Sequence, residues 1–159
     1  MDQLPWTGGC RCGQVRFEVT APPLITMACH CSGCQRMSAS AFSLSVLILA
    51  AGLTITAGEP VVGGLHGADK HMFCPHCKSW MFTRPGPVPH LINVRPTMLD
   101  EHAWVWPFVE TYTCEKLPWA STPAPHRFER FPPMDEYPAL LQAFATEGAH
   151  PRRPFTPRS

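Results

Sequence analysis

The amino-acid sequence predicts a mainly β fold with one short helix near the end of the chain. Nineteen prolines among 159 residues argue against a helix-dominated fold, because proline interrupts helices. The segment "QVRFEVT" (14–20) alternates apolar Val15, Phe17 and Val19 with polar residues, which is typical of a half-buried strand. Glycine, proline and aspartate separate it from other short apolar segments, as in all-β domains.

Apolar–polar alternation and separation by glycine, proline and aspartate also predict the remaining strands, in chain order. Apolar residues recur at period two in "AFSLSVLI" (41–48), which predicts a second strand. Further short strands are expected at 53–57, 71–73, 80–83, 90–94 and 108–113. These predicted strands are spread along the chain from residue 14 to residue 113.

A helix is expected at about 136–146. Pro138 suits its first turn, and Gly148 is a plausible stop. Leu140, Leu141 and Phe144 would share one face of this helix. The last segment, 150–159, is rich in proline and arginine, and we expect a loose end there.

Composition narrows the class of protein. The chain is 45% hydrophobic and 16% charged with a net charge of +1, so nothing argues for nucleic-acid binding. The start "MDQLPWTGG" lacks the pattern of a secretory signal, and the apolar stretch 41–53 is too short to span a bilayer. We therefore expect a soluble cytoplasmic protein without membrane contact, in which eight cysteines are ligands or catalytic groups rather than disulfides.

Two short cysteine motifs predict a closed metal site. Cys10 and Cys12 form a C-x-C pair, and Cys74 and Cys77 form a C-x-x-C pair. Each pair supplies two sulfurs from one turn, and four thiolates suit a structural zinc ion. An iron–sulfur cluster and a redox C-x-x-C pair are the alternatives. "KSWMFT" after Cys77 reads as a strand, whereas a redox pair usually begins a helix.

The motif "CHCSGC" (29–34) predicts a second site with an open position. In extended backbone Cys29 and Cys31 point to one side and His30 to the other, and a tight turn at residues 32–33 brings Cys34 to the same centre. Three thiolates leave one coordination position free, as in catalytic zinc sites. Two alternatives stay open: Cys114 as a fourth ligand, or a different division of the clustered cysteines.

The segments "GGCRCGQVRFEV", "CHCSGCQR", "FCPHCKSWMF", "INVRPTMLDE" and "EKLPW" resemble the glutathione-dependent formaldehyde-activating enzyme family, also called centromere-protein-V-like. The resemblance runs from about Trp6 to Phe131 and implies an Mss4-like fold of small antiparallel sheets around a zinc-linked core. It implies that residues 1–131 are the zinc-binding domain. Residues 132–159 would be a helix and tail that belong to the same domain or are partly loose.

The resemblance also implies roles for the cysteines. Cys10, Cys12, Cys74 and Cys77 match the ligands of a structural zinc ion. Cys29, Cys31 and Cys34 match the ligands of a second, catalytic zinc ion that glutathione approaches. Family members are described as carbon–sulfur lyases, and the founding activity joins formaldehyde to glutathione. Two zinc ions and a thiol co-substrate are therefore expected.

The sequence departs from the family at two places. Lys78 stands where the family usually has glycine, at a position that often needs left-handed backbone, so we expect a slightly different turn. Arg95 and Pro96 lie near the glycine expected in "N-x-G-x-L-D", so we expect a different pocket lining. Cys114 is outside the zinc pattern and is expected to be half-buried on a strand.

Several other residues are candidates for the chemistry. Arg36 is the first candidate and Lys116 the second to offset the negative charge of a three-thiolate zinc site, and Arg36 could also bind a glutathione carboxylate. Trp119 is a candidate to line the glutathione site. The candidates for proton transfer are His66, His71 and Asp100.

Two other functional classes compete with a lyase. A non-catalytic zinc-stabilised binding module of the same fold would have a closed second site or none. A methionine sulfoxide reductase would need a separate catalytic cysteine, and Cys114 is the one left over. The open three-cysteine motif favours the enzyme.

Overall fold

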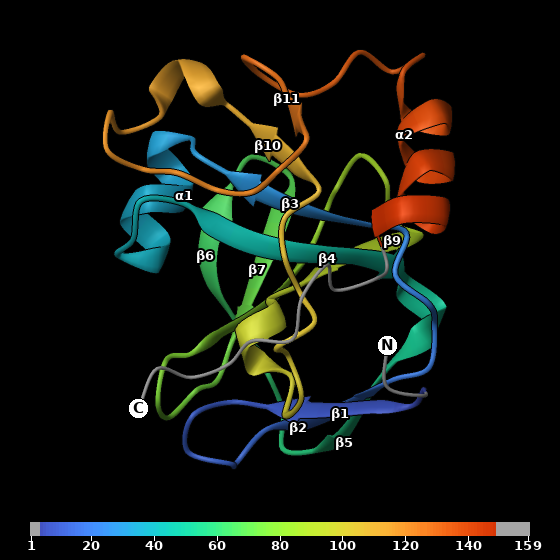
Figure 1. Ribbon diagram of the computed structural model, residues 1–159. Coiled ribbons are helices and arrows are strands. Elements are labelled where there is room, and N and C mark those ends of the chain that lie inside the picture. The colour runs from blue at the N-terminus through green and yellow to red at the C-terminus, as the bar shows by residue number, and fades with distance from the viewer. Residues whose placement is uncertain (1–3, 149–159) are drawn as a thin grey trace, which may run out of the picture.

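The computed structural model of the protein describes residues 4–148 and confirms the predicted mainly β fold with a short C-terminal helix (Figure 1). The strands are β1 (Trp6–Gly9), β2 (Arg16–Val19), β3 (Ile25–Cys29), β4 (Ser43–Leu49), β5 (Leu53–Ala57), β6 (Val61–His66), β7 (Asp69–Phe73), β8 (Trp80–Arg84), β9 (Leu91–Val94), β10 (Val109–Thr111) and β11 (His126–Arg127). The helices are α1 (Ser32–Ser38) and α2 (Tyr137–Ala143), with 3₁₀ turns η1 (Ala50–Gly52), η2 (Pro96–Met98) and η3 (Thr113–Glu115) and a π-helical turn η4 (Phe144–Gly148).

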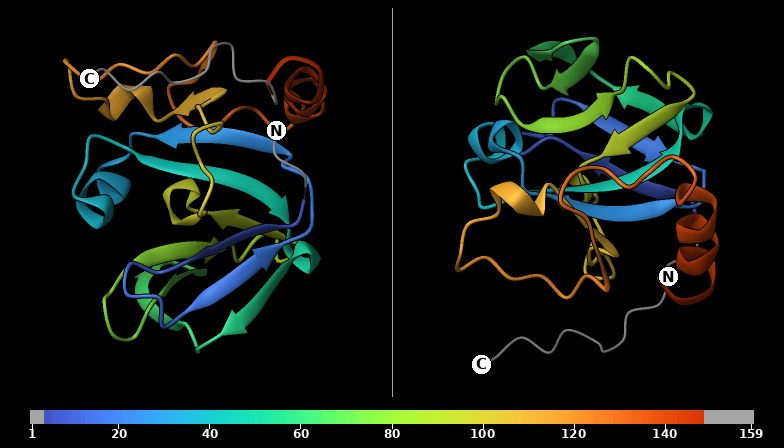
Figure 2. Two further views of the ribbon diagram at one scale, coloured as in Figure 1. Left: turned by 60° about the horizontal axis from the view of Figure 1, so that its bottom comes forward. Right: turned by 90° about the horizontal axis from the view of Figure 1, so that it is seen from above.

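Within the described residues the strands form two sheets. The smaller one is antiparallel, in the order β1-β2-β5, and the larger one has the order β11-β10-β3-β4-β9-β8-β7-β6. The larger sheet is mixed, because β10 pairs in parallel with both β3 and β11. Figure 2 shows the small sheet lying against one part of the large one, and the side chains between them form the main core.

The alternation in "QVRFEVT" is confirmed as a strand with one buried face. Val15, Phe17 and Val19 are each 1% exposed and belong to the core between the sheets. The other predicted strands are also present, within a residue or two of the expected limits at most ends. The sequence patterns did not reveal β1, β3, β6 and β11.

β3 was not predicted from sequence because it lies at the centre of the large sheet. β3 and β4 pair antiparallel over Ile25–Cys29 and Ser43–Leu47, and residues on both faces of each strand are buried. Ile25 and Leu47 lie in a second apolar cluster with Phe108, while Val46 and Ile48 lie in the first. A strand that is buried on both faces need not alternate, so period two is a weak signal for it.

The C-terminal helix covers the second apolar cluster. Leu140 and Phe144 are buried against Ile25, Leu47 and Phe108, and Pro138 occupies the first turn as predicted. α1 and α2 stand at opposite ends of β4 in Figures 1 and 2. The Pro/Arg-rich tail lies outside the described residues. None of the helices in the described part of the chain combines the length and the apolar character that a membrane crossing requires.

Candidate metal centres and pocket

Four cysteines from two distant turns form the first cluster. Cys10 and Cys12 lie in the turn between β1 and β2, and Cys74 and Cys77 lie in the turn between β7 and β8. The four sulfurs all lie within 4.8 Å of one another, with 3.5 Å between Cys10 and Cys12 and 3.8 Å between Cys12 and Cys74. A tetrahedral zinc site with bonds of about 2.3 Å places its sulfurs roughly 3.8 Å apart, so this cluster fits zinc.

The backbone around this cluster is shaped to hold the sulfurs. The amide of Val15 donates to Cys10 Sγ at 3.3 Å, and the Cys77 sulfur lies 3.2 Å from Ser79 Oγ. That contact with Ser79 lowers the pKa of Cys77 to about 5, which favours the thiolate that a metal needs. A metal here would join the small sheet to the large one.

Lys78 adopts the conformation that glycine would supply. Its φ is 58°, and its amide donates to the carbonyl of Cys74 at 3.2 Å. The expected change in this turn is therefore wrong, because lysine accepts the left-handed backbone at some conformational cost. The Lys78 ammonium closes the turn by donating to the carbonyl of Pro75 at 2.7 Å.

Three cysteines form the second cluster. Cys29 ends β3, Cys31 immediately precedes α1, and Cys34 lies in the first turn of α1; their sulfurs lie within 4.8 Å of one another. Cys114 does not join the group found among the described residues. It is exposed in η3, so the expected half-buried position on a strand is wrong. The donor set is all sulfur, which fits a soft divalent ion such as zinc.

A helix, rather than the expected tight turn, brings Cys34 back to the cluster. α1 begins at Ser32, and the Cys31 sulfur caps it by accepting the amide of Cys34 at 3.3 Å. The Ser32 amide donates to a carboxylate oxygen of Glu115 at 2.6 Å, which satisfies another free amide of the first turn. The sequence signals did not reveal this capping role of Glu115.

The three thiols of the second cluster differ in the direction in which their pKa values are shifted. Cys34 donates to Cys29, which lowers the pKa of Cys29 to about 5 and raises the pKa of Cys34. Burial raises the pKa of Cys31. The hydrogen bond from Cys34 thus favours the thiolate at Cys29, and a cation that binds the cluster would release the remaining thiol protons.

His30 points away from the sulfurs. Its ring is fully buried, and Nε2 lies 3.1 Å from Oε1 of Glu110 in β10. Burial alone would raise the pKa of Glu110, but hydrogen bonds from Lys116, Thr122 and His30 hold that pKa below its usual range. An ionised carboxylate only accepts, so Nε2 of His30 donates and is engaged on the side opposite the cysteines.

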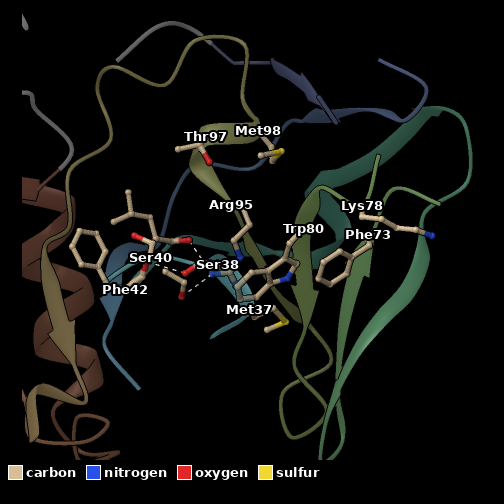
Figure 3. A pocket seen from close by; sticks show the side chains of 12 residues that line it. Met37, Ser38, Ser40, Phe42, Phe73, Lys78, Trp80, Arg95, Thr97 and Met98 are labelled. Carbon is tan, nitrogen blue, oxygen red and sulfur yellow. Dashed lines mark hydrogen bonds between the residues drawn. The ribbon is translucent and has the colours of Figure 1, made fainter. Parts of the chain in front are cut away.

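A pocket of about 410 Å³ opens beside the second cluster. It adjoins the cluster through Ser43, which pairs with Cys29 across the β3–β4 ladder, and through Ser38, whose hydroxyl donates to the carbonyl of Cys34. Figure 3 shows its walls, which come from α1 and the following loop, β4, the β7–β8 region and η2. The lining residues are Met37, Ser38, Ser40, Phe42, Ser43, Leu44, Phe73, Lys78, Trp80, Arg95, Thr97 and Met98.

Arg95, which the sequence analysis expected to affect the pocket lining, does line the pocket. It follows β9, is 9% exposed, and stacks on Trp80 with 3.8 Å between its guanidinium carbon and the ring centroid. Burial lowers its pKa to about 10, and the sulfurs of Cys34 and Cys29 oppose that shift, so they lie within electrostatic range. The family's glycine position was the signal for Arg95 in the lining, whereas no sequence signal assigned it a role in charge balance.

The structure does not bring the other predicted site residues to the pocket. Arg36 is exposed on α1, and its neighbours Met37 and Ser38 line the pocket instead. Trp119 is 74% exposed and does not line the pocket either. Lys116 donates to both oxygens of Glu110 at 2.7 and 3.0 Å, so its charge is matched by that carboxylate.

Of the three candidates for proton transfer, Asp100 and His71 also lie outside the lining of the pocket. Asp100 accepts hydrogen bonds from Arg16 and from Thr7, at the small sheet. His71 is buried in β7, with Nδ1 2.8 Å from the hydroxyl of Thr83. His66 ends β6, a strand that pairs with β7.

Comparisons with known proteins agree with this architecture. A crystal structure of a Rhodobacter sphaeroides protein, a structural-genomics target, is similar with a TM-score of 0.51 and 22% identity. The similarity covers 59% of this chain and 87% of that chain, and it supports the fold alone. The family model described as glutathione-dependent formaldehyde-activating enzyme matches residues 5–115, which include both cysteine clusters. By this match, the chain belongs to the family of glutathione-dependent formaldehyde-activating enzymes.

Proposed function

We propose that this protein is a zinc-dependent carbon–sulfur lyase, which forms or cleaves the adduct between a thiol such as glutathione and an aldehyde such as formaldehyde. One observation carries the proposal. Three cysteine sulfurs lie within 4.8 Å of one another beside a pocket of about 410 Å³. A purely structural zinc site would have a fourth protein ligand and would need no pocket.

The proposed ligands divide into two sets. Cys10, Cys12, Cys74 and Cys77 would hold a structural zinc ion, and Cys29, Cys31 and Cys34 would hold a second one. A zinc ion with three protein thiolates keeps a position for an incoming sulfur and lowers the pKa of the thiol that binds there.

The chain's own residues would supply orientation and charge balance. In the forward direction the thiol sulfur bonds to the aldehyde carbon, the carbonyl π bond breaks, and the thiol proton ends on the new hydroxyl oxygen. The reverse direction returns that proton to sulfur as the carbon–sulfur bond breaks. Arg95 supplies positive charge near Cys29 and Cys34, which offsets part of the thiolate charge. The Ser38 and Ser43 hydroxyls lie at the pocket wall beside the cluster.

Exchange measurements by nuclear magnetic resonance test the activity. With ¹³C-formaldehyde and glutathione, the zinc-loaded protein should increase the interconversion rate of the free aldehyde and the hydroxymethyl adduct above the uncatalysed rate. Cys29→Ser should abolish the increase, and Cys114→Ser, at an exposed cysteine outside both clusters, should keep it. If the wild-type protein accelerates no thiol–aldehyde pair, the non-catalytic binding module is the better description.

A cytoplasmic location is part of the same proposal. All eight cysteines are free, and two clusters of thiols need a reducing compartment to stay available for metal. Fractionation of cells that produce the protein would test this location.

A further inference from the structure

The pocket contains a buried positive charge that is not neutralised by a carboxylate. Arg95 is 9% exposed, and among residues 4–148 the ion pairs of Arg16, His30, Lys116 and Arg127 do not include it. A buried guanidinium is usually paired, because removing a charge from water without a partner is costly. Because no carboxylate of the described residues meets this group, which lies in a ligand-sized pocket beside the cysteine cluster, we infer that Arg95 binds a carboxylate of the substrate. The inference deepens the proposed function and rests on it.

The guanidinium has a donor left for a ligand. Nη1 donates to the hydroxyl of Ser43 at 3.3 Å and to the carbonyl of Leu44 at 2.9 Å, and Nη2 donates to the hydroxyl of Thr83 at 3.1 Å. These bonds use three of the five N–H groups of arginine. Nε is buried and has no partner within the described residues. One N–H of Nη2 is therefore left to donate to a carboxylate oxygen of a ligand, while Nε is covered by protein.

A network around Thr83 fixes the orientation of Arg95. Its hydroxyl accepts from Arg95 Nη2 at 3.1 Å and from Trp80 Nε1 at 3.2 Å, and both of these groups only donate. The hydroxyl proton is then directed to Nδ1 of His71 at 2.8 Å. Thr83 thus holds the guanidinium and the indole on which it stacks, so Thr83 and Trp80 are positioning residues.

The pocket favours an anion larger than formaldehyde. Its volume of about 410 Å³ lies in the range of sites that enclose small organic ligands. Ser40 and Thr97 add hydroxyl donors to its lining, and no carboxylate is among the lining residues. Figure 3 shows the Lys78 ammonium directed away from Arg95, and it donates to Pro75, so Arg95 is the cation of the pocket lining that is placed to meet the ligand.

Paired ligands test this inference on the zinc-replete protein. One thiol pair is 3-mercaptopropionate and 3-mercaptopropionamide, which differ in the carboxylate. Calorimetry should show the carboxylate binding roughly tenfold more tightly or better, the range expected for a charge-assisted hydrogen-bond pair. Arg95→Met should reduce this preference to near unity. Comparing the preference between variants cancels the intrinsic difference between the two thiols.

A second pair locates the carboxylate on the other reactant. Glyoxylate and glycolaldehyde are compared in the presence of 2-mercaptoethanol, a neutral thiol. A preference for the charged member in either pair that disappears in Arg95→Met supports the inference and identifies which reactant bears the carboxylate. Equal affinities within both pairs, or a preference that survives in Arg95→Met, would overturn it.

Control variants separate binding from folding. Lys78→Met removes the other cation of the lining and should leave the preference unchanged, because its ammonium is bound to Pro75. Arg95→Lys should retain part of the preference, since it keeps the charge and loses the planar donors. If Arg95→Met does not fold, the wild-type comparison and Arg95→Lys still decide the outcome.

Absorption spectra of the cobalt-substituted protein distinguish a failure of this inference from a failure of the proposed function. Sulfur-to-cobalt absorption changes when a thiol enters the metal's coordination sphere. If no thiol changes this spectrum while the carboxylate preference of the pocket persists, the lyase proposal fails and the role of Arg95 stands. If thiols change the spectrum but neither ligand pair shows a carboxylate preference, the proposed role of Arg95 fails and the lyase proposal stands.

Discussion

Glu110 is a buried carboxylate whose replacement by glutamine should destabilise the fold strongly. Its side chain is fully buried and lies within 3.2 Å of His30, Lys116, Thr122 and Arg127. Breaking a buried ion pair by removing one partner costs about 3–5 kcal/mol. Arg127 is 61% exposed and Lys116 is 21% exposed, so both cations can regain water and the lower end of that range applies.

The expected loss is therefore about 3 kcal/mol in the free energy of unfolding. For a chain of this size each 1 kcal/mol lowers Tm by roughly 2–4 °C, which predicts a fall of about 6–12 °C. Circular dichroism during heating measures it, with both proteins zinc-replete. Glu115→Gln is the matched control, because its carboxylate is exposed and caps α1 through Ser32; a clearly smaller loss of stability is expected.

The pH dependence provides an independent check. The folded-state pKa of Glu110 is lowered, so its stabilising effect is fully present above the unfolded-state value of about 4.3. That effect is lost as the pH falls through the lower folded-state pKa. The difference between wild type and Glu110→Gln should shrink accordingly on acidification. A difference below about 1 kcal/mol at neutral pH would refute the buried-network reasoning.

Three further predictions concern the metals and the C-terminal helix. Mild chelation should release the metal of the Cys29 cluster first, because it has three protein ligands instead of four; equal release rates in a colorimetric zinc assay would contradict this. His30→Ala should retain both metals but lower stability, because Glu110 loses a donor; metal analysis that finds one zinc lost would place His30 among the ligands. Leu140→Ala should cost about 2–5 kcal/mol in urea unfolding, against little for the exposed Gln142→Ala. A small effect of Leu140→Ala would count against a C-terminal helix that is part of the same domain.

The prediction of the large sheet from sequence was limited by burial on both faces. β2 was found because one face meets the core and the other meets water, which produces alternation. β3 has no such contrast, since β4 and β10 flank it and apolar clusters cover it. α1 was missed for another reason: it has seven residues, none of them buried, so it has no apolar face to detect.

The sequence by itself determined that each short motif brings its own sulfurs together and that His30 faces away. The spacing within each motif spans a few residues, so backbone geometry brings the sulfurs of one motif together and side-chain alternation turns His30 aside. The meeting of the Cys10–Cys12 pair with the Cys74–Cys77 pair depends on the fold. Tertiary structure decided what surrounds the sulfurs. Val46 pairs with Val94 and Ser43 pairs with Cys29, and this register carries Arg95 to the cysteine cluster. Such contacts depend on long-range strand pairing, which no local pattern encodes, and therefore the charge and shape of the pocket became visible only in the fold.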